Sequence, residues 1–259
     1  MIIPSEHVFG NNKYLLPNCF AHILKTEAAL ELTQRKYLNT LQLKMIAACA
    51  MFIDHTMYTF YPYAYELRTI GRLAFPIFAF LVAIGYDKTR NLTMYMGRMF
   101  LFALIAQIPY QKMVGLPGVS PNVIFTLFFG LGAILAIEKG NAFIRIFFPI
   151  ALILGAEILA FDHSAYGVLM VLALYYSKDS KLIASIWIAF LTLLFSLQYF
   201  LIGGLENPGW YIVLFYLFTI PLIWMYNGRK GLSNNFTKWF FYIFYPAHIV
   251  FLVILKSLI

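Results

Sequence analysis

Charged residues are scarce in this sequence: Asp, Glu, Lys and Arg make up 12% of 259 residues, against about 25% in a soluble domain. Hydrophobic residues reach 62%, whereas soluble domains contain about 45–50%. A chain of this composition cannot cover its surface with polar groups, which excludes an ordinary water-soluble domain. The sequence therefore indicates an integral membrane protein.

Cysteine is nearly absent, and the two cysteines, Cys19 and Cys49, have neither CxxC spacing nor a histidine cluster nearby. We expect no disulfide framework and no metal site. The net charge of +8 would suggest a nucleic-acid partner if the basic residues formed one patch. They fall instead in the connections between apolar segments, mostly on one side, which indicates membrane orientation and no nucleic-acid partner.

Long polar stretches are also missing, except for residues 1–40. This stretch lacks the basic start, apolar run and small-residue cleavage site of a secretory signal. Apolar residues at nearly helical spacing between Phe20 and Leu32 predict a helix that lies on the lipid headgroups. We expect residues 1–40 to be a cytoplasmic or interfacial tail and residues 41–259 to be one transmembrane domain.

Apolar segments follow one another closely after Thr40. They predict an all-α polytopic helix bundle with about nine transmembrane helices, at about 41–61, 69–87, 92–112, 121–138, 142–160, 164–177, 181–202, 209–226 and 236–257. The sixth segment is shorter than the roughly 17 residues normally needed to span a bilayer, so we expect it to be tilted or re-entrant.

Lys and Arg accumulate on alternate sides of these segments. Fifteen fall on one side, and only Arg68, Lys112 and Lys256 fall on the other, with Arg72 just inside the second segment. The excess predicts a cytoplasmic N-terminus and an external C-terminus. With this topology, Asp54, His55 and Arg72 all lie toward the outer leaflet.

The first apolar segment contains two adjacent ionisable residues, Asp54 and His55, which are costly in a membrane. One interpretation is structural: Asp54 pairs with Arg72 or Arg68, and His55 binds a carbonyl. The other is that His55 is a general base, which takes a proton from an attacking amine or hydroxyl. Adjacent helical positions diverge by about 100°, so direct pairing of Asp54 with His55 is not expected.

The second segment places Pro76 four residues after Arg72, where it removes the amide that would bond the Arg72 carbonyl. We expect an opened turn there, with Arg72 stabilising an oxyanion or another anion. The structural alternative is a bend around neighbouring helices. Toward the cytoplasm, Lys88, Arg90 and Arg98 either set topology and contact lipid heads or bind a phosphorylated donor.

Several other polar residues are candidates for contact with a substrate. Gln107 and Asn122 lie near outer helix ends, where hydrogen bonding between helices is the alternative explanation. Asp162 is expected to cap the sixth helix, and the adjacent His163 is a substrate-facing candidate. His248, in the last segment, is either a satisfied core histidine or a second member of the site.

The stretches LKMIAACAMFIDH, IGRLAFPIFAFLVAIGYDKTRN, FALIAQIPY, PNVIFTL, YGVLM and FYIFYPAH together resemble the TraX family over residues 41–257. That family is known for N-terminal acetylation of conjugative pilin in the bacterial inner membrane. It looks like a member of the wider group of multispanning acyltransferases that use cytosolic acyl-CoA. Two positions depart from the expected pattern: Ile84 replaces an acidic residue, and Asp162, His163 and Ser164 replace aspartate-tyrosine-glycine.

The resemblance implies that His55 is catalytic, that Asp54 and Arg72 are its motif neighbours, and that His248 is a motif residue of unassigned role. It implies an acetyl-CoA donor, no metal, and a pilin or another envelope acceptor on the outer side of the inner membrane. The remaining alternatives are acetylation of an envelope glycan, a transporter or channel that uses the same charges, and a noncatalytic scaffold. A transporter predicts internal repeats, and none is evident.

Overall fold

The computed structural model describes residues 37–115 and 120–259. Its secondary structure is helical, and no β-strand occurs among these residues. One compact unit covers Asn39–Ile259. The headgroup helix predicted between Phe20 and Leu32 lies outside the described residues.

The helices are α2 (Thr40–Phe60), α3 (Tyr65–Gly71), α4 (Ala74–Lys88), α5 (Leu92–Val114), α6 (Val123–Lys139), α7 (Ala142–Ile158), α8 (Ser164–Tyr176), α9 (Lys181–Gly203), η1 (Gly204–Glu206), α10 (Gly209–Leu214), η2 (Phe215–Phe218), α11 (Thr219–Trp224) and α12 (Asn235–Leu258). All nine predicted segments are helical. The second is divided into α3 and α4, and the eighth into α10, η2 and α11.

The predicted eighth segment, 209–226, corresponds to an apolar helix over Gly209–Trp224, but this helix is not α-helical throughout. A 3₁₀ turn, Phe215–Phe218, interrupts it. Pro221 has no N–H to bond the carbonyl of Leu217, so an α-helical ladder cannot run unbroken through this point. A short stretch of 3₁₀-helix accommodates the missing bond.

Asparagine side chains begin most of the long helices. Each accepts a hydrogen bond from a backbone N–H of the first helical turn, at Asn39, Asn91, Asn122, Asn141 and Asn234. These bonds satisfy amides that have no partner within the helix. The local sequence thus determines where the helices start, in agreement with the predicted boundaries to within a few residues.

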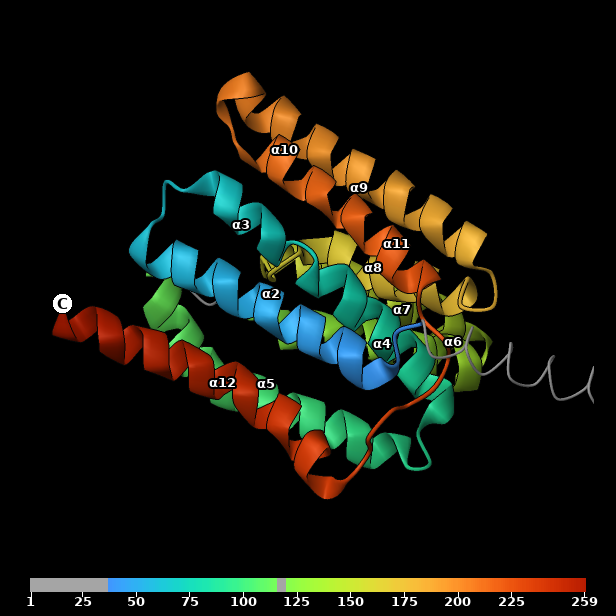
Figure 1. Ribbon diagram of the computed structural model, residues 1–259. Coiled ribbons are helices and arrows are strands. Elements are labelled where there is room, and N and C mark those ends of the chain that lie inside the picture. The colour runs from blue at the N-terminus through green and yellow to red at the C-terminus, as the bar shows by residue number, and fades with distance from the viewer. Residues whose placement is uncertain (1–36, 116–119) are drawn as a thin grey trace, which may run out of the picture. The chain divides into compact units, whose positions relative to one another are not determined.

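Helix α2 carries both Asp54 and His55. It packs against α3, α4 and α12, and α12 also packs against α5. Figure 1 shows α12 and α5 along one side of α2, and α9, α10 and α11 on the opposite side of the unit. Residues from the first and last predicted segments therefore meet.

Within residues 37–115 and 120–259, four helices are long and apolar enough to cross a membrane: Tyr65–Lys88, which joins α3 and α4, Leu92–Val114, Lys181–Glu206 and Asn235–Leu258. Ser164–Tyr176 and Gly209–Trp224 are shorter apolar helices. The chain therefore has the helices of a membrane protein. The full set of nine spans and its orientation stay predictions.

The opened turn expected before Pro76 is confirmed. Helix α3 ends at Gly71 and α4 begins at Ala74, while the Arg72 N–H donates to the Thr69 carbonyl at 3.1 Å. Helices α2 and α3 approach so closely here that a Cβ on Gly71 would lie 2.1 Å from the Cβ of Asp54. Glycine at this position lets the Arg72 side chain reach the first helix.

The capping role predicted for Asp162 was wrong. The N-cap of α8 is His163, which makes no side-chain capping bond, and the Asp162 carboxylate instead contacts the His163 ring at 3.1 Å. The chain enters α8 through left-handed conformations at His163 (φ 70°) and Ser164 (φ 44°). This entry turns the Asp162 side chain away from the first amides of the helix.

Replacing Ser164 with glycine is expected to stabilise the protein by about 1 kcal/mol. A left-handed non-glycine residue costs roughly 1–2 kcal/mol, which exceeds the roughly 0.4–1 kcal/mol that glycine adds to the entropy of the unfolded chain. The thermal unfolding midpoint in detergent should rise. Ser185→Gly, inside α9, should lower it, and a fall with Ser164→Gly would contradict the strain.

Candidate functional site

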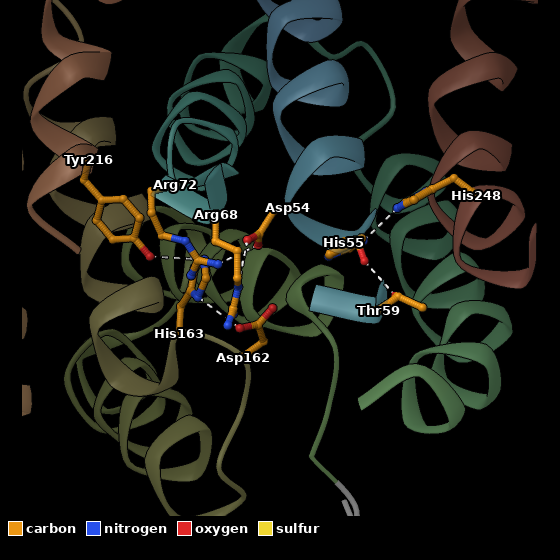
Figure 2. Close-up of polar contacts among 9 residues, drawn as sticks. All are labelled: Asp54, His55, Thr59, Arg68, Arg72, Asp162, His163, Tyr216 and His248. Carbon is orange, nitrogen blue, oxygen red and sulfur yellow. Dashed lines mark hydrogen bonds and ion pairs between the residues drawn. The ribbon is translucent and has the colours of Figure 1, made fainter. Parts of the chain in front are cut away.

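Asp54 is held between two arginines of the α3 segment. Its Oδ2 accepts a hydrogen bond from Arg72 Nη2 at 2.5 Å, and its Oδ1 accepts one from Arg68 Nε at 3.4 Å. The Asp54 side chain is 14% exposed and each arginine side chain is 18% exposed. The geometry thus agrees with the structural interpretation of Asp54, because both carboxylate oxygens are engaged (Figure 2).

A second acidic group lies on the other side of Arg72. Asp162 pairs with His163, whose Nε2 lies 3.4 Å from the Tyr216 hydroxyl, and Phe75 packs edge-on against the His163 ring. Burial raises the pKa of Asp162, but the interactions of its carboxylate with His163 and with the Arg72 guanidinium outweigh burial and hold this pKa at about 2. Figure 2 shows these residues gathered on one side of α2. We call Asp54, Arg68, Arg72, Asp162 and His163 the ionic cluster.

His55 points to the other side of α2, toward α12. Its Nδ1 lies 2.7 Å from Nε2 of His248, and the two rings stack with their planes 9° apart and their centroids 5.0 Å apart. Figure 2 shows this pair well separated from the ionic cluster. Neighbours in the sequence thus point in different directions, as the 100° step of a helix requires.

Two hydrogen bonds in series define the protonation pattern of the pair. His248 Nδ1 lies 2.8 Å from the Phe244 carbonyl, which can only accept, so this nitrogen carries hydrogen. In a neutral His248, Nε2 is then an acceptor, and His55 Nδ1 must donate to it. The lone pair of neutral His55 is consequently on Nε2, which is the nitrogen available as a base.

A cavity of about 480 Å³ lies among α2, α4, α5, α6 and α12. Its lining extends from Thr40 at the start of α2 to Met51, and on α12 to Tyr245, one turn before each histidine of the pair. Five cationic side chains and no acidic side chain line it among the described residues: Lys44, Lys88, Arg98, Lys230 and Lys238. Such a cavity favours an anion at one end and an apolar group at the other.

The predicted basic group is only partly assembled at this cavity. Lys88 and Arg98 line it, whereas Arg90 is exposed and outside its lining. The Lys88 ammonium donates to the Gly228 carbonyl at 2.9 Å, and the Arg98 guanidinium lies over the Tyr242 ring. Lys88 thereby attaches the segment before α12 to the cavity wall.

Sequence reasoning missed Lys44, Lys230 and Lys238. Lys44 had a signal, because it is a lone cation inside the first apolar segment, and Ala48, Met51 and His55 follow it at helical spacing on the same face. Lys230 and Lys238 carried no sequence signal, except that both fall on the side predicted to be cytoplasmic. Their approach to α2 depends on the long-range packing of α12.

The side chains of Gln107 and Asn122 are joined by a hydrogen bond. The Gln107 carbonyl oxygen accepts from both nitrogens of Asn122, at 3.0 Å and 2.8 Å, and Gln107 Nε2 donates to the Ser120 carbonyl. Asn122 is fully buried and also caps α6. These contacts match the expected alternative of hydrogen bonding between helices.

Similarity to known proteins identifies the family of this chain. The family described as "TraX protein" matches residues 39–256. The chain is 29% identical to "Probable fimbrial assembly protein FimC, serogroup H1" of Dichelobacter nodosus, over 83% of this chain and 94% of that protein. It is 32% identical to "Uncharacterized protein RP591" of Rickettsia prowazekii (strain Madrid E), over 34% of this chain and 33% of that protein. No solved structure gives a significant match. The chain belongs to the TraX family.

Proposed function

We propose that this protein is an integral membrane acetyltransferase of the bacterial inner membrane. It would move an acetyl group from cytosolic acetyl-CoA to an acceptor at the outer face, with the N-terminal amine of a pilin subunit as the acceptor. The observation that carries the proposal is the cationic cavity, whose lining ends one turn from the His55–His248 pair. Membership of the TraX family supports it.

The cavity suits the two halves of a CoA thioester. The phosphates would bind at the cationic end, which the charge distribution of the sequence puts on the cytoplasmic side. The pantetheine arm would follow the apolar wall of α2, past Ala48 and Met51. Lys44 and His55 are separated along α2 by about 16 Å of helical rise, a span comparable with an extended phosphopantetheine arm.

Transfer would proceed by direct attack on the thioester. The acceptor amine forms a bond to the carbonyl carbon, its proton passes to Nε2 of His55, and the carbonyl electron pair moves to oxygen. When the tetrahedral species collapses, the carbon–sulfur bond breaks and the CoA thiolate takes the proton from His55. His248 accepts from His55 Nδ1 and so keeps the ring in the orientation that this cycle needs.

A pilin acceptor is supported by the relative described as a fimbrial assembly protein and by the activity for which the TraX family is known. An envelope glycan would present a hydroxyl instead of an amine to the same base. The two acceptors differ in nucleophile but not in the catalytic group required, so both belong in the assay.

The test uses the purified protein in detergent, with labelled acetyl-CoA and two acceptor panels, pilin N-terminal peptides and envelope glycans. We expect label in the peptides and saturable binding of CoA. Failure to bind CoA and to label any acceptor, together with movement of a solute into liposomes, would replace the enzyme by a transporter. Labelled glycan alone would keep the enzyme and change its acceptor.

Removing two cavity cations together, in Lys230→Gln/Lys238→Gln, is expected to raise KM for acetyl-CoA roughly 5–50-fold. Each contact between a cation and a phosphate contributes about 0.5–1 kcal/mol at a solvated site, and more where the site is partly desolvated. Initial rates over a range of donor concentrations measure this change, and it should shrink at high salt. Lys139→Gln/Arg145→Gln removes the same charge outside the cavity lining and should leave KM unchanged. Equal effects of the two double variants would contradict a donor site here.

A further inference from the structure

The hydroxyl group of Tyr245 is buried without a hydrogen-bond partner among the described residues. The residue is 5% exposed. Leaving a buried hydroxyl unpaired costs roughly 1–3 kcal/mol. A phenylalanine at this position would avoid the cost. Buried polar groups without a partner are exceptional in native proteins, so this hydroxyl requires an explanation.

Tyr245 is also the residue that joins the cavity to the histidine pair. It lines the end of the cavity nearest to the histidine pair. Its ring contacts His55 and His248 edge-on, with centroid distances of 6.2 Å and 5.7 Å. A thioester carbonyl that is close enough to His55 to be attacked must therefore lie beside the Tyr245 side chain.

A helix N-terminus lies at the same place. Val123, the first residue of α6, lines the cavity as Tyr245 does. The Asn122 cap binds the amide of the following residue, Ile124, so it does not occupy the Val123 N–H. The positive end of the α6 dipole thus adds to the hydroxyl at one point of the cavity wall.

Arg72, the oxyanion donor expected from the sequence, lies away from the cavity. Its guanidinium is bound to Asp54, and it is not among the residues that line the cavity. Figure 2 shows it on the opposite side of α2 from the His55–His248 pair. Stabilisation of negative charge on the donor thioester requires a group on the α12 side.

We propose that Tyr245 is a further catalytic residue, which donates its hydroxyl hydrogen to the carbonyl oxygen of the donor thioester. This inference rests on the proposed acetyltransferase function. As the acceptor nitrogen bonds to the carbonyl carbon, the oxygen gains the carbonyl electron pair and the Tyr245 hydrogen bond strengthens. The proton stays on Tyr245, while the proton of the acceptor passes to His55. When the carbon–sulfur bond breaks, the electron pair returns to re-form the carbonyl.

The test is Tyr245→Phe, which removes only the hydroxyl. Removal of one oxyanion donor typically lowers kcat by about 10²–10³-fold, and we expect a loss in this range with little change in KM for acetyl-CoA. Because the hydroxyl has no partner among the residues that the structure describes, the unfolding midpoint should stay equal or rise. A spectroscopic readout is the infrared carbonyl band of bound ¹³C-labelled acetyl-CoA, which should lie at lower frequency in the wild type than in the variant.

Tyr86→Phe is the matched control. Tyr86 also has a buried hydroxyl oxygen that finds no partner within residues 37–115 and 120–259. It packs on Tyr175 outside the cavity lining, and its variant should keep wild-type kcat. The inference fails if the wild type transfers acetyl and Tyr245→Phe does so within about threefold, a change of only about 0.7 kcal/mol, or if this variant unfolds. A wild type that neither binds acetyl-CoA nor transfers acetyl overturns the proposed function as well.

Discussion

Replacing His55 by alanine is expected to lower acetyl transfer by about 10²–10⁴-fold, the range typical of a positioned general base. His55 is the member of the stacked pair whose Nε2 keeps a free lone pair, since its Nδ1 is bonded to His248. Initial rates at saturating acetyl-CoA measure the loss. Binding of CoA should stay within a few-fold of the wild type, because the cationic side chains of the cavity are unchanged.

His248→Gln is the informative companion of His55→Ala. A glutamine carbonyl can accept from His55 Nδ1 in place of the imidazole nitrogen, so this variant should keep more activity than His248→Leu, which offers no acceptor. Turnover by His55→Ala at the wild-type rate would leave the protein without its proposed base. Equal rates for the Gln and Leu variants would show that His248 does not act through the orientation of His55.

Local sequence signals predicted most of the fold. The apolar segments predicted where the helices lie, and Pro76 correctly predicted the opened turn at Arg72. The structure shows that asparagines such as Asn91 and Asn234 cap the helix starts. Predictions failed where the backbone took an uncommon conformation. The left-handed entry into α8 at His163 removed the expected cap by Asp162, because only a few per cent of non-glycine residues adopt positive φ and the prediction assumed an ordinary helix start.

The candidate site was predicted less completely, because its parts come from distant segments. The sequence selected His55 and His248 separately, but only the packing of α12 on α2 shows that the two rings bond. It also left open whether Asp54 and Arg72 are catalytic or partners of each other. Tyr245 lies within the stretch FYIFYPAH, but one tyrosine among 18 cannot be recognised as unpaired before its neighbours are known.

Replacing Asp54 by alanine is expected to destabilise the protein by about 3–5 kcal/mol, the usual cost of breaking a buried ion pair and leaving its partner charged. Arg72 and Arg68 would both lose the carboxylate that they share. The Arg72 guanidinium already has one buried nitrogen, Nε, without a partner in the described part of the chain. A lower unfolding midpoint in detergent, and a lower yield of folded protein, measure the effect.

The double variant Asp54→Ala/Arg72→Leu separates a structural from a catalytic role. If the two residues mainly neutralise each other, removing both should cost clearly less than the sum of the single variants, and the folded protein should retain acetyl transfer. Arg72→Lys then provides the finer comparison, because it keeps the charge but loses the planar fork that binds a carboxylate at two points. Full stability with a large loss of kcat in Arg72→Lys would restore the catalytic role predicted from the sequence. Lower stability with unchanged kcat per folded molecule would assign Arg72 to the support of α2, the helix that carries His55.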